Sequence, residues 1–423
     1  MTDAASLPRR ALVLGLARSG HAAALALRAH GVEVVAHDRS RLIEIARLVD
    51  AGVKVHLGEE KERKTLLRGA DVLVKSPGIP AAHPLVVAAR TKDVSVWSEI
   101  EVGARLLRNP LLGVTGTNGK TTTTALLGEI FRAAGVQAEV AGNIGRPLTS
   151  LVGQAASEAW IVCELSSQQL EDTHTLSPRI AVLLNLEPDH LDHHGGYEAY
   201  SDAKLRVFRN QTAAEVAVLP RGFGAVPGGA RRLDFDADDA LPAEPAVPGR
   251  HNRENAAAAT VAARAAGLND DAIALGLRTF PGVPHRIEEV AVVRGVRWVN
   301  DSKATNVAAA RRALQAFRDN RLHVILGGLG KQESYRPLAA DLKLGDRAYL
   351  IGDAAGQIAG ALDVAHVPYL HCGELTTAVR EAAAAASPGE VVLLSPACAS
   401  FDQFDDYEAR GEAFRRLVLE LAS

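Results

Sequence analysis

Residues 113–122 read Gly-Val-Thr-Gly-Thr-Asn-Gly-Lys-Thr-Thr and constrain the fold most, because they require a strand, a tight turn and a helix in succession. The apolar run 111–114 predicts a buried strand, and residues 122–134 have the composition of a helix. Glycines in such a turn let backbone N–H groups point at phosphate oxygens, while the lysine adds positive charge and the threonine hydroxyl can ligate Mg²⁺. The segment therefore predicts a site for a nucleoside triphosphate.

The match is to a variant of the phosphate-binding loop. Val114 stands where the general pattern has glycine, and Gly113 lies one residue early. An ordinary glycine turn without a ligand is the alternative interpretation.

The first hundred residues alternate short apolar runs with helical stretches, which is typical of a parallel sheet covered by helices. Gly15 and Gly20 follow the first run as in a dinucleotide fingerprint, and Asp38 ends the second run, where a ribose-binding carboxylate would stand. Ala17 replaces the central glycine, which weakens a nicotinamide interpretation and leaves a nucleotide or sugar-nucleotide site and a plain tight turn both open. The strands of this region are expected at 11–14, 32–36, 53–56 and 72–75.

Two further runs of strands predict two more α/β units. We expect residues 220–250, which are rich in Gly, Pro and Asp, to form a surface excursion or small strands, and residues 278–284 to form a hinge. The chain is therefore expected to be an α/β protein with three domains, at 1–97, 98–281 and 282–423. The strands beyond the first domain are expected at 111–114, 160–165, 180–184, 324–326, 349–352 and 391–395.

Composition narrows the partners and the compartment. The 47 Lys and Arg against 50 Asp and Glu give a net charge of -3. The chain as a whole therefore has no excess of positive charge that would favour a nucleic acid as partner. No apolar segment is long enough to cross a bilayer, and the 3 cysteines form no CxxC pair. We expect a cytoplasmic protein without a membrane span, with reduced, structural thiols.

Acids, imidazoles and lysines after the central strands are the candidate cation ligands. Glu164 ends an apolar strand, so its carboxylate is expected beside the phosphate loop. Residues 185–194 hold acids and histidines within ten positions, which suits Mg²⁺ with oxygen ligands better than zinc, although a solvated histidine loop stays open. Lys204 by spacing alone is an ordinary helix lysine. Residues 300–306 fit either an anion site or a helix cap.

Seven separated motifs, taken together, resemble the Mur ligase family. They are Thr-Gly-Thr-Asn-Gly-Lys-Thr-Thr at 115–122, Glu-Leu-Ser-Ser at 164–167, Asp-His at 189–190, His-Asn at 251–252, Pro-His-Arg at 284–286, Asp-Ser-Lys-Ala-Thr-Asn at 301–306 and Leu-Ser-Pro-Ala-Cys-Ala-Ser at 394–400. The resemblance runs along the whole chain. It implies an N-terminal Rossmann-like domain that binds UDP, a central P-loop ATPase domain with a parallel sheet, and a C-terminal Rossmann-like α/β domain that brings the incoming amino acid.

Within that family, Ser-Pro-Gly at 76–78 and the motifs at 301–306 and 395–400 are similar to those of the members that join D-glutamate to UDP-N-acetylmuramoyl-L-alanine. The resemblance implies that ATP phosphorylates the carboxylate of the nucleotide substrate and that the amine of D-glutamate then attacks the acyl phosphate. ATP and two Mg²⁺ ions are the implied cofactors, and we expect a monomer.

The resemblance also assigns residues to roles. The implied catalytic residues are Lys120, Glu164, His190 and Lys204. The implied metal ligands are Thr121, Glu164, His190 and Lys204, the last in carbamylated form. The implied ATP contacts are Gly116, Thr117, Asn118, Gly119, Lys120, Thr121, Thr122, Asn252, Asn255, Arg286 and Asp301. The implied contacts of the UDP-substrate are Ser19, Asp38, Arg39, Ser76, Gly78, Asn143 and Gln169. The implied D-glutamate contacts are Lys303, Thr305, Lys331, Ser400, Phe401 and Tyr407.

Three residues depart from the family pattern, and other functions remain as alternatives. Phe401 and Tyr407 stand where leucine and phenylalanine are familiar, and Gln168 replaces an apolar residue, so a ligase of this type with another acceptor amino acid is the first alternative. A folylpolyglutamate synthase would lack the N-terminal nucleotide domain. An NAD-dependent oxidoreductase would leave the phosphate loop unexplained, and a non-catalytic nucleotide-binding regulator would bind ATP without substrate-dependent release of ADP.

Overall fold

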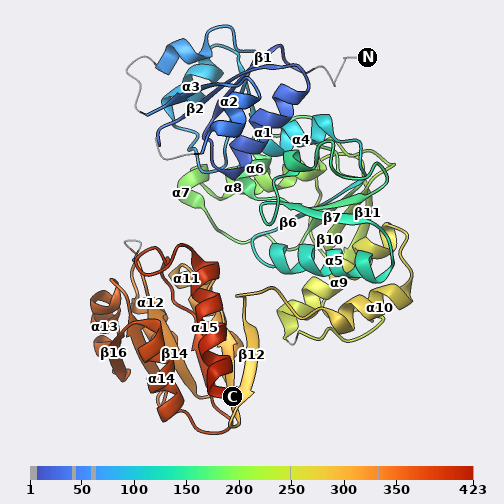
Figure 1. Ribbon diagram of the computed structural model, residues 1–423. Helices are drawn as coiled ribbons and strands as arrows, with labels where there is room; N and C mark the ends of the chain where they lie inside the picture. The colour runs from blue at the N-terminus through green and yellow to red at the C-terminus, as the bar shows by residue number, and fades with distance from the viewer. Residues whose placement is uncertain (1–6, 41–43, 59–62, 248, 331–332, 423) are drawn as a thin grey trace. The chain divides into compact units, whose positions relative to one another are not determined.

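The computed structural model describes residues 7–40, 44–58, 63–247, 249–330 and 333–422. The chain divides into two compact units, Met1–Pro281 and Gly282–Ser423, which are described separately below (Figure 1). The domain boundaries that we expect after residues 97 and 281 stay predictions.

The first unit begins with a five-stranded parallel sheet in the order β3-β2-β1-β4-β5. The four strands predicted from the sequence are confirmed. A fifth strand, β5, was not expected, and the boundary predicted after residue 97 falls inside it. The elements are β1 (Arg10–Leu14), α1 (Arg18–Ala29), β2 (Glu33–Asp38), α2 (Ala46–Asp50), β3 (Lys54–Leu57), η1 (Arg63–Leu67), β4 (Val72–Lys75), α3 (Pro84–Thr91), β5 (Ser95–Ser98) and α4 (Glu99–Leu106).

A second, six-stranded parallel sheet follows, in the order β11-β10-β9-β6-β8-β7. Its elements are β6 (Leu111–Thr115), α5 (Lys120–Ala133), β7 (Ala138–Gly142), η2 (Leu148–Leu151), β8 (Trp160–Glu164), α6 (Ser167–Leu170), β9 (Ile180–Leu183), α7 (Leu191–His194), α8 (Tyr197–Leu205), η3 (Arg206–Phe208), β10 (Val216–Pro220), β11 (Arg231–Phe235), α9 (Arg250–Ala265) and α10 (Asp270–Thr279). The region 220–250 contributes the edge strand β11, one of the small strands that its composition allowed.

The central strands of both sheets in the first unit are buried on both faces, whereas the edge strands β3 and β11 are partly exposed. All four residues of β4 and of β9 are buried, which explains why these strands read as continuous apolar runs and not as alternating ones. Separate apolar clusters pack against the first sheet, one including Leu27 and Val74 and another including Leu73 and Val86. A third cluster, which includes Ile161 and Leu183, packs against the second sheet. Because β6 lies in the middle of the second sheet, its carboxyl end is flanked by the ends of β8 and β9.

The second unit has a mixed six-stranded sheet in the order β12-β13-β17-β14-β15-β16, in which β12 and β13 are antiparallel and the other pairs are parallel. Apolar clusters pack against it through α11 on one side and α14 and α15 on the other. The elements are β12 (Glu288–Val293), β13 (Val296–Asn300), α11 (Val307–Ala316), β14 (Leu322–Gly327), α12 (Arg336–Asp341), β15 (Arg347–Ile351), α13 (Ala355–Val364), β16 (Tyr369–Gly373), α14 (Leu375–Ala385), β17 (Val391–Leu394) and α15 (Tyr407–Ala422).

Among the described residues, no helix combines the length and the apolar character that crossing a bilayer requires. The three cysteines, Cys163, Cys372 and Cys398, are free, and burial raises the pKa of each thiol. A raised pKa disfavours the nucleophilic thiolate, so these residues are structural.

Candidate functional site

The glycine-rich turn between β6 and α5 forms a compact loop. Lys120 begins α5 and folds back, so that its Nζ donates hydrogen bonds of 2.9 Å to the carbonyl oxygens of Gly116 and Thr117. Gly119 has φ of 81°, and a Cβ there would lie 2.2 Å from Oδ1 of Asn255. Only glycine fits this position, because both the left-handed backbone and the close approach of the asparagine exclude a side chain. The loop has the form that the sequence predicts.

Side chains from the segment after β9 brace the loop. Oδ1 of Asn185 accepts a hydrogen bond of 2.8 Å from the backbone N–H of Asn118. The hydroxyls of Thr117 and Tyr200 are 2.8 Å apart, and Thr117 Oγ1 also accepts a hydrogen bond of 2.9 Å from the N–H of Glu187. These contacts hold the loop in shape, so its N–H groups do not need a ligand to be ordered.

Glu164 lies at the end of β8, beside the loop, as predicted. Its side chain is buried, and Oε1 accepts a hydrogen bond of 2.8 Å from Nδ2 of Asn143. Oε2 has no hydrogen-bond partner although it is buried. A buried carboxylate oxygen without a partner is costly, which is the expected condition of a cation ligand before the cation binds. Thr121 is also buried, at the first turn of α5.

Lys204 comes from α8 and is buried in the same region. Its Nζ lies 2.7 Å from the carbonyl oxygen of Gly116 and 5.0 Å from the centre of the Tyr200 ring. Burial and then the neighbouring Lys120 ammonium lower the pKa of Lys204 from 10.5 to about 7. Spacing alone predicted an ordinary exposed helix lysine at this position. That prediction is wrong, because tertiary packing removes the amine from water.

One pocket collects most of the predicted catalytic residues. His190 is half exposed, with φ of 48°, and its Nε2 is 3.7 Å from the carboxylate of Asp189. The pocket brings together groups that are far apart in the sequence, which supports a single reaction centre. It is lined by Pro77, Lys120, Asn143, Ser166, Ser167, Gln168, Asp189, His190, Tyr200 and Lys204.

A second pocket shares Pro77 and Asn143 with the first and holds Ser19 and Gln169 of the predicted UDP-substrate contacts. Gln169 forms a capping box with Ser166 at the start of α6, which fixes its side-chain oxygen. The full lining is Arg18, Ser19, Pro77, Gly142, Asn143, Gly145, Pro147 and Gln169.

The other predicted UDP-substrate contacts do not line these two pockets. The Asp38 carboxylate is already hydrogen-bonded to the backbone. Oδ2 accepts from the N–H of Leu16 in the turn after β1 at 2.7 Å, and Oδ1 accepts from the N–H of Ser40 at 2.8 Å. Ser76 Oγ donates to the carbonyl oxygen of Gly15 at 2.9 Å. Arg39 and Gly78 are exposed. The fingerprint-like turn at 15–20 is thus held by side chains from the ends of two other strands, Asp38 at the end of β2 and Ser76 after β4.

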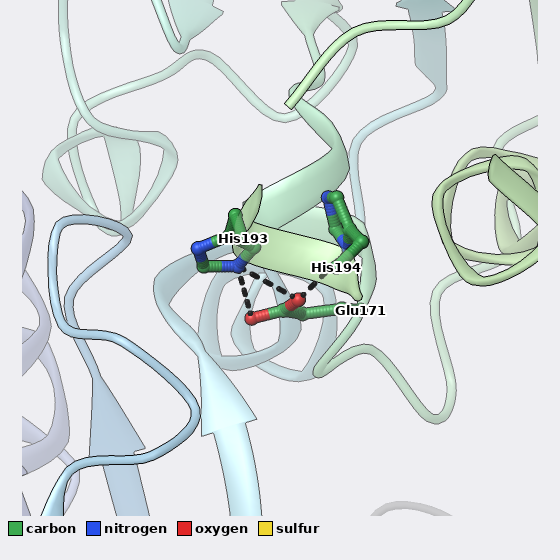
Figure 2. A group of neighbouring side chains, drawn as sticks. All are labelled: Glu171, His193 and His194. Carbon is green, nitrogen blue, oxygen red and sulfur yellow. Dashed lines mark hydrogen bonds and ion pairs between the residues drawn. The ribbon is translucent and has the colours of Figure 1, made fainter. Parts of the chain in front are cut away.

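The histidines of residues 185–194 separate into two groups. His190 lines the reaction pocket, whereas His193 and His194 turn toward Glu171 (Figure 2). Lys75, whose side chain is fully buried at the end of β4, lies 2.6 Å from Glu171 and 3.1 Å from Asp172. Sequence reasoning missed this group. The available signal was a lysine that ends an otherwise apolar strand.

The predicted adenine contacts Asn252 and Asn255 both lie on α9. Asn255 is buried against Gly119 of the loop, while Asn252 is partly exposed one turn earlier. The same helix therefore reaches the phosphate loop and a more open position beside it.

In the second unit, Asp301 is buried at the end of β13. Its Oδ2 accepts a hydrogen bond of 2.7 Å from Ser395 Oγ, and burial raises its pKa to about 7. Arg286 lies close enough to oppose this shift, and its Nε is buried without a hydrogen-bond partner. A buried guanidinium nitrogen without a hydrogen-bond partner is available to donate a hydrogen bond to an anion.

Of the predicted D-glutamate contacts, Lys303 and Tyr407 contact each other in the structure. Lys303 Nζ donates a hydrogen bond of 3.0 Å to the hydroxyl of Tyr407 and lies over its ring. Ser400 is buried, Thr305 is partly buried, and the Phe401 side chain is exposed. Lys331 lies outside the described residues. Asn306 caps α11 by accepting from the N–H of Ala309, so the helix-cap interpretation of 300–306 is confirmed for this residue.

The oxygen donors next to the reaction pocket suit Mg²⁺, although Thr121 and Glu164 are not among the residues that line it. Thr121 and Glu164 offer hard oxygen ligands, and the free Oε2 of Glu164 is the group most in need of a cation. Lys204 offers an oxygen only if its amine is converted to a carbamate, which requires the neutral amine that its lowered pKa supplies. Zinc is less suitable, because no cysteine lines the pocket.

Family profiles match three parts of the chain. Residues 9–98 match the Mur ligase MurD-like N-terminal domain, residues 114–222 the Mur ligase middle domain, and residues 285–398 the Mur ligase glutamate ligase domain.

Curated relatives match over nearly their whole length. The relative from Sphingopyxis alaskensis is 43% identical over 100% of both chains, and that from Anaeromyxobacter dehalogenans is 42% identical over 98% of both. The relative from Acidobacterium capsulatum is 41% identical over 97% of this chain and 96% of its own. All three are named UDP-N-acetylmuramoylalanine--D-glutamate ligase.

Solved structures share the fold at low identity. UDP-N-acetylmuramate-alanine ligase MurC from Thermotoga maritima has a TM-score of 0.60 at 19% identity, covering 98% of this chain and 100% of its own. MurF from Acinetobacter baumannii has a TM-score of 0.59 at 18% identity, covering 98% and 93%. Three matched domains, full-length relatives and the shared fold agree, and the chain belongs to the Mur ligase family.

Proposed function

We propose that this chain is an ATP-dependent ligase that joins D-glutamate to UDP-N-acetylmuramoyl-L-alanine, a step of peptidoglycan precursor synthesis. The observation that carries the proposal is the 43% identity with a ligase of that name over 100% of both chains. The pocket supports it, because Lys120 of the phosphate loop and the candidate nucleotide-substrate residue Asn143 line the same pocket.

In the proposed reaction, the carboxylate of the alanyl group attacks the γ-phosphorus of ATP, which forms an O–P bond and releases ADP. The amine of D-glutamate then attacks the acyl carbon of this acyl phosphate. A C–N bond forms, phosphate leaves with its bonding electrons, and the amine loses a proton. Lys120 and the N–H groups of residues 116–122 bind and stabilise the phosphoryl group that moves.

Two Mg²⁺ sites are part of the proposal. Thr121 and Glu164 would hold one ion, and His190 together with carbamylated Lys204 would hold the other. Bound Mg²⁺ neutralises charge on the phosphate oxygens during transfer. Asn143 orients Glu164 through the hydrogen bond of 2.8 Å, so the carboxylate presents its free oxygen in a fixed direction.

The surroundings of Lys204 support the proposed carbamylation. The neutral amine attacks CO₂, a C–N bond forms, and a proton is released, so that a cation becomes an anion with two oxygens. At a pKa of about 7, a large share of the amine is neutral at physiological pH. An ordinary exposed lysine would be almost entirely protonated there.

The remaining substrate contacts are proposed by residue. Asn252 and Asn255 would contact adenine, Arg286 a phosphate and Asp301 the ribose. D-glutamate would be bound by Lys303, Thr305, Lys331, Ser400, Phe401 and Tyr407, where the lysines supply charge and the hydroxyls fix direction. The UDP-substrate would be bound by Ser19, Asp38, Arg39, Ser76, Gly78, Asn143 and Gln169.

The test is phosphate release from ATP and Mg²⁺ in the presence of UDP-N-acetylmuramoyl-L-alanine. D-glutamate, L-glutamate, D-aspartate and meso-diaminopimelate are compared as acceptors, and the product is identified by mass spectrometry. Release that requires both the nucleotide and D-glutamate is the expected result. Release with another amino acid would keep the ligase and change the acceptor, and ATP binding without any release would contradict the proposal.

A further inference from the structure

Lys75 is a fully buried lysine whose ammonium group is surrounded by acceptors from the protein. Its Nζ lies 2.6 Å from Oε1 of Glu171 and 3.1 Å from Oδ2 of Asp172. It also donates a hydrogen bond of 3.3 Å to the carbonyl oxygen of Ile79. An ammonium group has three donors and no acceptor, so these three contacts use its whole capacity. Lys75 therefore holds parts of the chain together and does not itself bind a ligand.

One partner of Lys75 belongs to the turn after β4, which contributes to both pockets. The N–H of Ile79 donates to the carbonyl oxygen of Ser76 at 3.0 Å and closes the turn, while Ser76 Oγ donates to the carbonyl oxygen of Gly15. Pro77, inside this turn, lines the reaction pocket and the second pocket. The hydrogen bond from Lys75 to Ile79 therefore fixes the turn to the end of its own strand.

The two carboxylate partners directly follow α6, which contributes to the same pockets. Ser167 and Gln168 of this helix line the reaction pocket, and Gln169 lines the second pocket. Glu171 is the residue at which α6 ends. The ion pair with Lys75 thus joins the turn at 76–79 to α6, although the two paired residues are 96 positions apart in the sequence.

Glu171 also forms a group with His193 and His194 that has the spacing of a metal site (Figure 2). The Lys75 ammonium lies 2.6 Å from the same carboxylate and is closed off from water. A divalent cation bound there would repel this buried charge, which is unfavourable in an environment of low polarity. The Glu171 carboxylate is therefore assigned to the ion pair with Lys75.

The buried ion pair keeps the two segments at a fixed spacing, because loss of one charge leaves the other without compensation. Without the ammonium, Glu171 and Asp172 would be two adjacent carboxylates, and the Asp172 side chain is only 5% exposed. These carboxylates would move toward water and carry the end of α6 with them. The turn that holds Pro77 and the helix would then separate, and the pockets that they line would change shape.

The phosphate loop is held by other contacts. The residues that brace it are Asn185, Glu187 and Tyr200, on the segment after β9. A change at Lys75 should therefore alter the binding of the nucleotide substrate more than the binding of ATP.

We propose that Lys75 is a positioning residue for the nucleotide substrate, whose buried ion pair sets the spacing between the turn at 76–79 and α6. The second pocket, which both segments line, also holds Ser19 and Asn143 of the proposed UDP-substrate contacts. The inference rests on the proposed function for the identity of this substrate.

The experiment measures the Kd of UDP-N-acetylmuramoyl-L-alanine and of ATP by calorimetric titration, together with the KM values of the ligase reaction. Lys75→Met keeps a long apolar side chain but removes the charge. We expect the Kd and KM of the nucleotide substrate to rise by about 10-fold or more, because small displacements of a binding wall are costly. The Kd of ATP, and kcat at saturating substrates, should stay within about twofold of the wild-type values.

Arg90→Met is the matched control, because Arg90 contacts the other oxygen of Asp172 at 3.2 Å but has a side chain that is 50% exposed. Exposed ion pairs contribute little, so this variant should bind the nucleotide substrate with the wild-type Kd. Arg105→Met controls for stability, because it breaks a buried pair with Glu101 that lies within α4. It should lower the temperature of thermal unfolding without changing either Kd.

A double-mutant cycle tests whether Lys75 acts through its partner. Glu171 also contacts His193, so the loss in Glu171→Gln alone does not isolate the pair. In the Glu171→Gln background, the rise in Kd caused by Lys75→Met should be at least about threefold smaller than in the wild type, because the carboxylate left unpaired has already been neutralised.

Three outcomes would overturn this assignment while leaving the ligase function intact. They are an unchanged Kd in a folded Lys75→Met protein, an equal rise in the Kd of ATP, and the same effect of Lys75→Met in both backgrounds. A wild-type protein that does not bind the nucleotide substrate would instead overturn the proposed function itself.

Thermal unfolding of every variant separates misfolding from effects on binding. If Lys75→Met does not fold, the comparison of Glu171→Gln with His193→Phe replaces it, because both remove a contact of one carboxylate but only the first weakens the pair with Lys75. Only Glu171→Gln should then raise the Kd of the nucleotide substrate, and equal values for the two variants would contradict the assignment.

Discussion

At the scale of single residues, burial gives ordinary side chains unusual chemistry. Lys204 shows this most clearly, because its amine is packed under the phosphate loop, 2.7 Å from the carbonyl oxygen of Gly116. Glu164 has the complementary property, a buried carboxylate with one oxygen unpaired. Both residues are unfavourable for folding unless a ligand or a modification compensates them, which is typical of functional sites.

Lys204→Ala should lose most of the ligase activity, because the proposed carbamate oxygens disappear. A short-chain carboxylate such as acetate should restore part of it by occupying the space of the carbamate. The measurement is ligase rate against acetate concentration. Lys120→Ala, which removes a lysine from the same pocket, is the control and should not respond to acetate. Full activity of Lys204→Ala without acetate would refute the assigned role.

Lys204→Met should stabilise the protein near neutral pH in CO₂-free buffer. Because the pKa is about 7 in the folded chain and 10.5 when exposed, the unfolded chain binds more protons between these values, and wild-type stability rises with pH there. The advantage of methionine should therefore be largest at or below pH 7, up to about 5 kcal/mol, and should shrink toward pH 10. Urea unfolding at pH 7 and 9.5 measures it, and an advantage independent of pH would contradict the lowered pKa.

Glu164→Gln should reduce ligase activity by about 100-fold or more, because the amide keeps the shape but loses the charge that would hold Mg²⁺. The expected signature is a higher Mg²⁺ concentration for half-maximal rate. Glu99→Gln is a suitable control, because Glu99 is equally buried in the same unit but its carboxylate accepts its hydrogen bonds from Thr149. If both variants lost activity equally, the effect would be one of packing.

At the scale of elements, the site depends on the parallel order of the middle sheet. β6 lies between β8 and β9, so the phosphate loop, Glu164 and the segment after β9 emerge at one edge. α9 then packs against the loop from another direction through Asn255. The loop is therefore enclosed by elements that are distant in sequence.

Gly119→Ala should abolish tight ATP binding and destabilise the protein by roughly 1–3 kcal/mol, because φ is 81° and the new Cβ would meet Asn255 at 2.2 Å. Gly135→Ala is the matched control, since Gly135 at the other end of α5 has φ of 67° with nothing within 4 Å. Both variants carry backbone strain, but only the first has a clash. Calorimetric titration with ATP and thermal unfolding should separate them, and equal ATP affinity would refute the close approach.

At the scale of the whole molecule, the chain is built as two compact units, Met1–Pro281 and Gly282–Ser423. Each has apolar clusters of its own around its sheets. The phosphate loop lies in the first unit, whereas the proposed D-glutamate contacts lie in the second. Substrate binding and acceptor binding are thus assigned to separately packed parts of the chain.

A fragment of residues 1–281 should fold and bind ATP but form no product, because it retains the loop and lacks the acceptor residues. Circular dichroism, ATP titration and the ligase assay test this on the fragment and the full chain side by side. An unfolded fragment would contradict the independence of the unit, and product formation would contradict the assignment of D-glutamate to residues 303–407.

The sequence by itself determined the local parts of this protein. The strand, turn and helix around residues 111–133, the four strands of the first sheet and the place of Glu164 follow from apolar runs and glycine spacing, which act over a few residues. The family resemblance supplied the reaction.

Only the tertiary structure decided how side chains distant in sequence affect one another. The lowered pKa of Lys204 and the fit of Asn255 against Gly119 arise where separate elements pack. The grouping of Lys75 with Glu171 and His194 joins residues up to 119 positions apart (194 − 75). Such effects depend on distance and burial in space, and a linear pattern of residues contains neither.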